Sequence, residues 1–214
     1  MELNFKKTSA KDRYKLLMSS VMPRPIALTT SKDSKGVINA APFSYFNVMS
    51  ATPPVLVMGV DSRSQGIFKD TVQNIRDTEE FVVNLVSEEM AERMNICAVD
   101  FPAGVSELDM SGLTSVASTQ VSVPRIAESP VNLECTMRMA IDIGSGRTIV
   151  VGDIVHYHIR DDLIDADKLY IAGERMHLIG RMHGKGWYAR TSDLFLMERT
   201  TVDEVRAKKR AKKT

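Results

Sequence analysis

The sequence predicts a mainly β protein, an antiparallel barrel to which a few short helices are attached. Predicted strands dominate the chain, and the predicted helices are few and short. The segments 131–143 and 148–159 alternate apolar and polar residues as half-buried strands do, and GSGR between them is typical of a hairpin turn. These observations favour an antiparallel barrel over a doubly wound parallel sheet, in which strands and helices would alternate.

The composition is that of a single globular domain. The 214 residues are 43% hydrophobic and 26% charged, which is sufficient for a substantial core. We find no internal repeat and no linker rich in Gly, Ser or Pro, so we expect one domain over residues 1–205. No apolar run approaches the roughly 18 to 20 residues of a membrane-spanning helix, and the first residues lack the apolar region of a secretory signal.

Cysteine usage and charge give weaker indications of location and partners. Cys97 and Cys135 form no CxxC motif, so we expect two reduced, buried thiols and a cytoplasmic protein. The net charge of +1 includes six basic residues in the tail 206–214, so residues 1–205 carry a net charge of −5. Such a tail can touch nucleic acid or be a frayed terminus; without a matching basic stripe in the body, we do not expect nucleic-acid binding.

The N-terminal half supplies most of the predicted strands. We expect helices at 12–18 and 69–78, the second with Val72, Ile75 and Arg76 at helical spacing. Ser34-Lys35-Gly36 is expected to form a turn between two of the strands. The strands of this half are expected at 23–31, 37–41, 55–60 and 81–87.

The C-terminal half is more irregular. We expect a helix at 88–95 and an extended loop at 97–120 that contains a small helix near 106–112. Strands are expected at 131–143, 148–159 and 194–198. In the first of these, one face is expected to hold Leu133, Cys135, Met137, Met139 and Ile141, and the opposite face Glu134, Arg138 and Asp142.

Two neighbouring segments predict a site for a phosphorylated flat ligand. In VINAAPFSYFN, residues 37–47, Asn39 and Ser44 stand among small and aromatic residues that can lie against a partly polar ring. The segment 62–74 then offers cations and hydroxyls for an anionic group, at a predicted helix start. Taken alone, this second segment is explained better by a solvated loop before a capped helix, and Asp70 would repel a phosphate unless it caps the helix or points away.

Three further motifs carry alternative interpretations. GSGRT, from Gly144, has Ile149 where a dinucleotide fingerprint needs its third glycine, and it joins two strands, so a hairpin turn explains it better. His156 and His158 would share one face of a strand and form a usable metal pair, but no third ligand is nearby in sequence; we predict a solvent-facing strand and no metal. GRMHGKGWYAR, from Gly180, either covers a flat ligand with its aromatic pair or forms a hairpin plugged by tryptophan.

The sequence offers binding groups and no acid–base machinery. We find no nucleophile elbow and no carboxylate pair at interpretable spacing, and we assign no catalytic residue. This pattern is typical of proteins in which a cofactor carries the chemistry and the protein binds and orients it.

Six segments, taken in order and spacing, resemble the flavin reductase-like family with the FMN-binding split-barrel fold, with flavoredoxin-type proteins as the nearest branch. The resemblance extends from Val21 to Arg190. The segments are PRPIALTTS, NAAPFSYFN, PPVLVMGV, KDTVQNI, FVVNLVS and GRMHGKGWYAR. The resemblance implies a six-stranded antiparallel Greek-key barrel with flanking short helices, and a homodimer with FMN near the subunit interface.

The resemblance also implies which residues surround the cofactor. Thr29, Thr30 and Ser31 would lie beside the flavin, and Trp187 and Tyr188 would approach it from the partner subunit. The ring would meet Asn39, Ala41, Pro42, Phe43 and Ser44, and the phosphate side would meet Arg63, Ser64, Lys69, Asp70 and Thr71.

The activity that the resemblance implies is an NAD(P)H-dependent flavin reductase. NAD(P)H would reduce FMN, and the electrons would pass to a second acceptor that the sequence does not identify. A flavin-binding electron carrier without NAD(P)H turnover is the alternative. In both cases the protein would contribute the ring platform at 39–47 and the phosphate-binding segment at 62–71.

Overall fold

A computed structural model of the chain describes residues 1–63, 66–102, 104–184 and 186–211, with the backbone alone at 207–210. The helices are α1 (Ala10–Ser20), α2 (Asp70–Thr78), α3 (Ala91–Ile96), α4 (Glu107–Ser111) and α5 (Val202–Ala211), with short 3-10 helices η2 (Glu88–Met90), η3 (Asp161–Leu163) and η4 (Gly173–Met176). The strands are β1 (Ala27–Lys32), β2 (Ile38–Phe43), β3 (Tyr45–Ala51), β4 (Pro54–Val60), β5 (Glu80–Leu85), β6 (Ser115–Val116), β7 (Arg125–Ile126), β8 (Val131–Gly144), β9 (Arg147–Ile159), β10 (Ile164–Asp165), β11 (Tyr170–Ile171), β12 (Ile179–Arg181) and β13 (Tyr188–Arg190).

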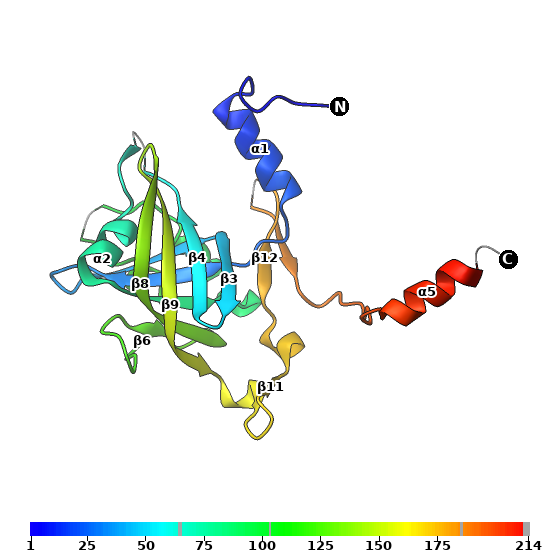
Figure 1. Ribbon diagram of the computed structural model, residues 1–214. Helices are drawn as coiled ribbons and strands as arrows, with labels where there is room; N and C mark the ends of the chain where they lie inside the picture. The colour runs from blue at the N-terminus through cyan, green and yellow to red at the C-terminus, as the bar shows by residue number, and fades with distance from the viewer. Residues whose placement is uncertain (64–65, 103, 185, 212–214) are drawn as a thin grey trace.

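The main sheet is antiparallel and curls into a barrel (Figure 1). Within the described residues it has seven strands in the order β2-β1-β5-β8-β9-β4-β3. The two outer strands, β2 and β3, are separated in the chain by Ser44 alone, so one bent segment supplies both edges. The predicted antiparallel barrel is confirmed. The strand count differs from the predicted six because this segment changes its partner at Ser44, from β1 to β4.

The barrel interior is filled by apolar residues from all sides of the sheet. The largest buried side chain is Phe81 of β5, which packs with Leu56, Met58 and Val150. Across the barrel, Gly152 of β9 leaves room for that ring, since a Cβ at this position would lie 2.5 Å from Phe81 Cζ. A glycine in the middle of a strand is therefore explained here by the close approach of an aromatic side chain.

Helix α2 closes the barrel with an apolar face. Val72 and Ile75 belong to the same core cluster as Phe81, as the predicted helical spacing requires. The helix ends at Glu79, which adopts a left-handed conformation with φ 58°. On the outer side Arg76 lies over the ring of Phe68, 4.6 Å from its centroid. The start of α2 lies beside the edge strand β2, where its residues contribute to the candidate functional site.

The predicted hairpin between the two longest strands is confirmed. β8 and β9 meet at Ser145 and Gly146, whose φ values are 53° and 70°. Positive φ at both central residues is the pattern of a type I′ turn, which suits the twist of paired strands. A strand follows the second glycine, so GSGRT has no helix start at which a dinucleotide could bind.

The predicted alternation along β8 holds up to Met137 and is wrong beyond it. Leu133 and Cys135 belong to the barrel core, and Glu134 lies on the opposite face, as predicted, paired with Val82. Glu134 is nevertheless fully buried, because the segment 119–121 covers this face and donates its N–H groups to the carboxylate. Met139 and Ile141, expected on the face of Leu133, are 47% and 46% exposed beyond a bulge between Met137 and Met139, and side chains beyond such a bulge change face.

The predicted strand at 194–198 is also absent from the described structure. Residues 192–200 form neither helix nor strand, and they lead into α5. The predicted helices at 12–18, 69–78, 88–95 and 106–112 are present, the third as a 3-10 turn followed by α3. Figure 1 shows α1 and α5 standing out from the barrel. No described helix is long and apolar enough to cross a membrane.

Candidate functional site

A cleft lies beside the barrel where the bend between β2 and β3 meets the start of α2. Its walls include parts of α1, the segment 39–45, the start of α2, the residues that follow α3 and the loop after β12. The cleft is lined by Tyr14, Met18, Arg24, Asn39, Ala41, Pro42, Phe43, Ser44, Tyr45, Gly59, Asp61, Arg63, Lys69, Asp70, Thr71, Cys97, Ala98, Val99, Asp100, Glu107, Arg181, Met182, His183 and Gly184. Segments that are far apart in sequence therefore share one cavity.

One wall of the cleft is a strand of small residues. Ala41 and Pro42 of β2 are half-buried and line the cavity together with Ser44. Because their side chains are short, this wall allows the backbone of β2 to approach a flat ligand closely. The predicted ring platform thus lies on the cleft wall.

Asn39 is held in place by hydrogen bonds to every polar atom of its side chain. Its Oδ1 accepts from Thr71 Oγ1 at 2.7 Å and from Ser31 Oγ at 3.3 Å. Its Nδ2 donates to Glu107 Oε2 at 2.8 Å. The same carboxylate oxygen accepts the backbone N–H of Ala40 at 3.2 Å. Asn39 therefore ties β2 to both α2 and α4, and this network holds the cleft wall rigidly.

Arg24 connects the bend between β2 and β3 to two other walls of the cleft. Its guanidinium is buried and donates from Nε to Ser44 Oγ at 3.2 Å. The other nitrogens donate to the carbonyls of Met18 and Val21, at 3.1 and 2.7 Å, and of Met182, at 2.9 Å. One cation thereby joins α1, the β2–β3 bend and the loop after β12. Sequence reasoning missed this role, although an arginine between two prolines is a visible signal.

The far end of the cleft is cationic, and its cations are paired with carboxylates. Arg63 contacts Asp70 at 2.5 Å, and Lys69 lies 3.4 Å from Asp100. Lys69 is also the residue that caps α2, and its side chain makes no capping hydrogen bond. The first N–H groups of α2 have no partner within the helix and carry the positive end of its dipole. This end of the cleft can therefore bind an anion that competes with the two carboxylates.

The predicted residues divide into three groups. Those that line the cleft are Asn39, Ala41, Pro42, Phe43, Ser44, Arg63, Lys69, Asp70 and Thr71. Among the described residues, those that do not line it are Thr29, Thr30 and Ser31, which are fully buried on β1, and Trp187 and Tyr188 near β13. Ser64 lies outside the described residues.

The residues away from the cleft have other contacts. Thr29 Oγ1 lies 3.1 Å from Met58 Sδ, and Thr30 Oγ1 donates to the carbonyl of Pro124 at 2.6 Å. Ser31 reaches the cleft only through Asn39. Trp187 is 61% exposed, and Tyr188 packs under Arg181, whose guanidinium lies 4.8 Å from the ring centroid. The expected contact of this aromatic pair with a cofactor of the partner subunit stays a prediction.

The irregular segment 97–120 contributes cleft residues that sequence reasoning missed, among them Glu107 and Cys97. Glu107 starts α4, behind the N-cap Ser106, whose hydroxyl accepts the N–H of Asp109. Cys97 is buried against the carbonyl of Glu107, and burial raises the pKa of its thiol. A protonated, buried thiol is a poor nucleophile, so the cleft contains no activated cysteine among its described residues.

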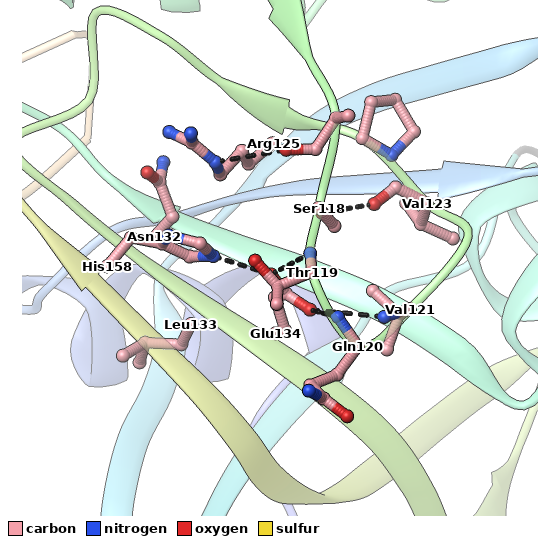
Figure 2. A network of polar contacts seen from close by, with 12 residues as sticks. Ser118, Thr119, Gln120, Val121, Val123, Arg125, Asn132, Leu133, Glu134 and His158 are labelled. Carbon is pink, nitrogen blue, oxygen red and sulfur yellow. Dashed lines mark hydrogen bonds and ion pairs between the residues drawn. The ribbon is translucent and has the colours of Figure 1, made fainter.

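The histidine pair on β9 has a third neighbour that the sequence did not indicate. Glu134, His156 and His158 place their ligand atoms within 4.8 Å of one another. The carboxylate oxygens of Glu134, however, accept the N–H groups of Thr119, Gln120 and Val121 and contact His158 Nε2 at 2.5 Å (Figure 2). A cation would have to displace these partners. The cluster therefore anchors the loop before β7 to the sheet.

The hydrogen bonds of Glu134 control its ionisation. Burial alone would raise the pKa of this carboxyl, but His158 and the three N–H groups outweigh burial and lower the pKa to about 2. Glu134 is therefore ionised at neutral pH in the interior of the protein. Its charge is compensated by partners within hydrogen-bonding distance.

Comparisons with known proteins agree with this architecture. The family model described as flavin reductase like domain matches residues 18–179. One similar solved structure is 2-nitrobenzoate 2-nitroreductase NbaA from Pseudomonas fluorescens, which is 39% identical and has a TM-score of 0.87, with 94% of this chain and 98% of that chain covered. Another is nitrilotriacetate monooxygenase component B from Bacillus cereus, which is 34% identical and also has a TM-score of 0.87, with 92% of this chain and 98% of that chain covered. The flavoredoxin of Desulfovibrio vulgaris (Miyazaki F) has the same fold at 15% identity, with a TM-score of 0.74 over 95% of this chain and 100% of that one.

Proposed function

The chain belongs to the flavin reductase-like family, and on this premise we propose that it uses FMN to carry electrons from NAD(P)H to a second acceptor. The observation that supports FMN most directly is the pair of cations at one end of a cleft whose wall is made of small residues. Arg63 and Lys69 stand beside the start of α2, and Ala41 and Pro42 form the wall. A phosphate monoester with nearly two negative charges suits the cations at the start of α2, and a flat ring suits the wall of small residues.

The residues of the cleft would bind and orient the cofactor. Arg63 and Lys69 would exchange their present carboxylate partners for the phosphate, while Thr71 and Asn39 keep α2 and β2 at a constant distance. When bound, FMN supplies the hydride-accepting chemistry, and the protein supplies position and electrostatics. Backbone N–H groups near Ser44 would stabilise negative charge on the ring, and Arg24, which donates a hydrogen bond to the hydroxyl of Ser44, would hold this segment in place. We assign no proton transfer to any side chain.

The acceptor and the assembly belong to the same proposal. The names of the two similar structures indicate a nitro compound or a partner monooxygenase as the acceptor. We propose a homodimer with FMN near the subunit interface, in which Trp187 and Tyr188 of one chain face the cofactor of the other. The two cysteines are free and buried, which suits a reducing cytoplasmic compartment.

The central test is an anaerobic titration of the FMN-loaded protein with NADH and, separately, with NADPH. We expect one of them to bleach the visible flavin band, and air, free FMN or 2-nitrobenzoate to restore it. A protein that binds FMN but is bleached only by dithionite would be an electron carrier without NAD(P)H turnover. A protein that takes up no flavin would contradict the proposal as a whole.

Asp100 is predicted to weaken the binding of the phosphate group. It lies 3.4 Å from Lys69 and its side chain is 74% exposed, so the two form a solvent-screened ion pair that a phosphate must displace. Asp100→Asn should therefore tighten FMN binding about twofold to fivefold, the range expected for an exposed pair. Fluorescence titration of FMN measures the change. Asp109→Asn, an equal charge change on the exposed side of α4, should leave the affinity unaltered.

A further inference from the structure

The segment between β13 and α5 exposes four consecutive large apolar side chains. Leu194, Phe195, Leu196 and Met197 are 67%, 82%, 89% and 78% exposed. Scattered apolar residues are ordinary on a protein surface, but a continuous run of this size marks a surface that another partner covers. We call residues 192–211, which include this run and α5, the C-terminal arm.

The arm does not pack on its own barrel. Figure 1 shows it leaving β13 and running away from the sheet to α5. The last tie to the body is at Thr191, whose N–H and hydroxyl both donate to the carbonyl of Leu178. Within the described part of the chain, residues 192–200 make no hydrogen bond or ion pair with the body. These residues therefore lack the partner strand that the predicted strand at 194–198 requires.

The barrel offers an apolar groove of about 710 Å³ that fits such a segment. We call it the β3 groove, because much of its rim is the strand β3, which pairs with β4 on one side and with no described strand on the other. Its walls include Phe46, Val48, Leu85, Leu133, Ile154 and Tyr157. Val48 and Tyr157 are 49% and 47% exposed, so part of the groove wall is open to solvent.

We infer that the arm of one chain docks in the β3 groove of a second copy of the same chain. Every copy carries both halves of this contact, so a two-fold exchange covers two arms and two grooves at once. An extended segment beside an open strand edge can also add to the sheet by backbone hydrogen bonds. Charge favours the same pairing, because residues 192–214 have a net charge of +3 and residues 1–191 a net charge of −2. The inference specifies the contact within the homodimer proposed above and rests on that proposal.

A cross-linking experiment between two differently labelled chains tests the inference. The native cysteines are both buried, so single exposed cysteines can be introduced without background reaction. Phe195→Cys supplies a thiol on the arm of one preparation, and Val48→Cys supplies a thiol in the groove of the other. After mixing and mild oxidation, we expect a disulfide-linked dimer in the mixture at least tenfold above either preparation alone. Ser34→Cys, in the exposed turn before β2, replaces Val48→Cys as the matched control and should give no such product.

A second experiment distinguishes exchange between two chains from other roles of the C-terminal arm. Phe195→Asp with Leu196→Asp should raise the dimer dissociation constant at least tenfold in sedimentation experiments, whereas Ser192→Asp should not. A disulfide within one chain carrying both Phe195→Cys and Val48→Cys, with no linked dimer, would overturn the inference. So would vesicle binding that depends on Phe195 in a protein whose mixture stays unlinked. FMN uptake is measured on the same samples, so a flavoprotein without the cross-link would reject the arm exchange and leave the proposed function standing.

Discussion

Replacing Arg63 and Lys69 together by alanine is expected to weaken FMN binding by at least about 100-fold. Each side chain would make a charge-assisted contact with the phosphate, and such contacts contribute roughly 1.5 to 3 kcal/mol each. Both residues line the cleft at the start of α2, where the helix dipole acts in the same direction. Isothermal titration or fluorescence quenching measures the two dissociation constants.

Riboflavin is the internal control for this variant, because it has the ring of FMN and lacks the phosphate. The double variant should bind riboflavin nearly as the parent protein does, since Ala41, Pro42 and Ser44 are untouched. Lys35→Ala removes a cation of the same kind from an exposed turn and should change neither affinity. An equal loss for FMN and riboflavin would mean that Arg63 and Lys69 do not bind a phosphate, and that the cationic end of the cleft has another role.

Replacing Glu134 by glutamine is expected to destabilise the fold by about 3 kcal/mol at neutral pH. The charged carboxylate accepts three backbone N–H groups and contacts His158 in a site without solvent access (Figure 2). Glutamine offers one acceptor oxygen in place of two and turns an amide toward the remaining donors, so buried donors lose their partners. Hydrogen bonds to charged groups are worth roughly 1.5 to 3 kcal/mol, and an unpaired buried donor adds to the cost. Urea unfolding at constant pH measures the loss.

The pH dependence of this stability has a definite sign. The folded state lowers the pKa of Glu134 from 4.5 to about 2, so the unfolded chain takes up a proton before the folded one. The contribution of Glu134 is therefore complete above pH 4.5 and is lost as the pH falls from 4.5 toward 2. The difference in unfolding free energy between the parent and Glu134→Gln should shrink across that interval. A difference that stays constant down to pH 2 would contradict the assigned ionisation.

Glu80→Gln is a matched control for this variant. Glu80 accepts the N–H and the hydroxyl of Ser122 at 2.8 and 2.6 Å, so it binds the same loop from a half-buried position, through hydrogen bonds that are exposed to solvent. Water can replace its lost contacts, and the expected cost is below about 1 kcal/mol. A similar loss in both variants would indicate that the loop, and not the buried charge, limits the stability.

The predictions that succeeded depend on residues close together in the chain. The hairpin at 144–147 was predictable because Ser145 and Gly146 can adopt the positive φ of a tight turn. Helix α2 was predictable because Val72 and Ile75 have helical spacing, and both pack in the core. The cations at 63 and 69 were visible for the same reason, since they flank one helix start. The predicted strand at 194–198 is wrong because a strand needs a partner as well as a pattern, and this segment pairs with no described strand of its own barrel.

The predictions that failed or were missing depend on contacts between distant segments. Met139 and Ile141 were expected on the face of Leu133 because alternation assumes an unbroken register, and the bulge before them cannot be read from side-chain pattern alone. The burial of Glu134 was missed because the segment 119–121, which covers its face, belongs to another part of the chain. Glu107 and Arg24 were missed as cleft residues because their partners are 68 and 20 residues away in the chain. Thr29 and Thr30 are buried on β1, and their place beside the flavin, which the resemblance implies, stays a prediction.

By itself, the sequence determined the antiparallel class, the order of the elements and the two segments that face each other across the cleft. It could do so because periodicity, turn residues and helix starts are local properties of the chain. Only the tertiary structure decided that Asn39 is locked between α2 and α4, that Asp70 and Asp100 neutralise the cations, and that Glu134 is buried as an ion. The physical reason is that a polar group takes its role from the partner that desolvates or pairs it, and in this barrel that partner comes from a distant segment.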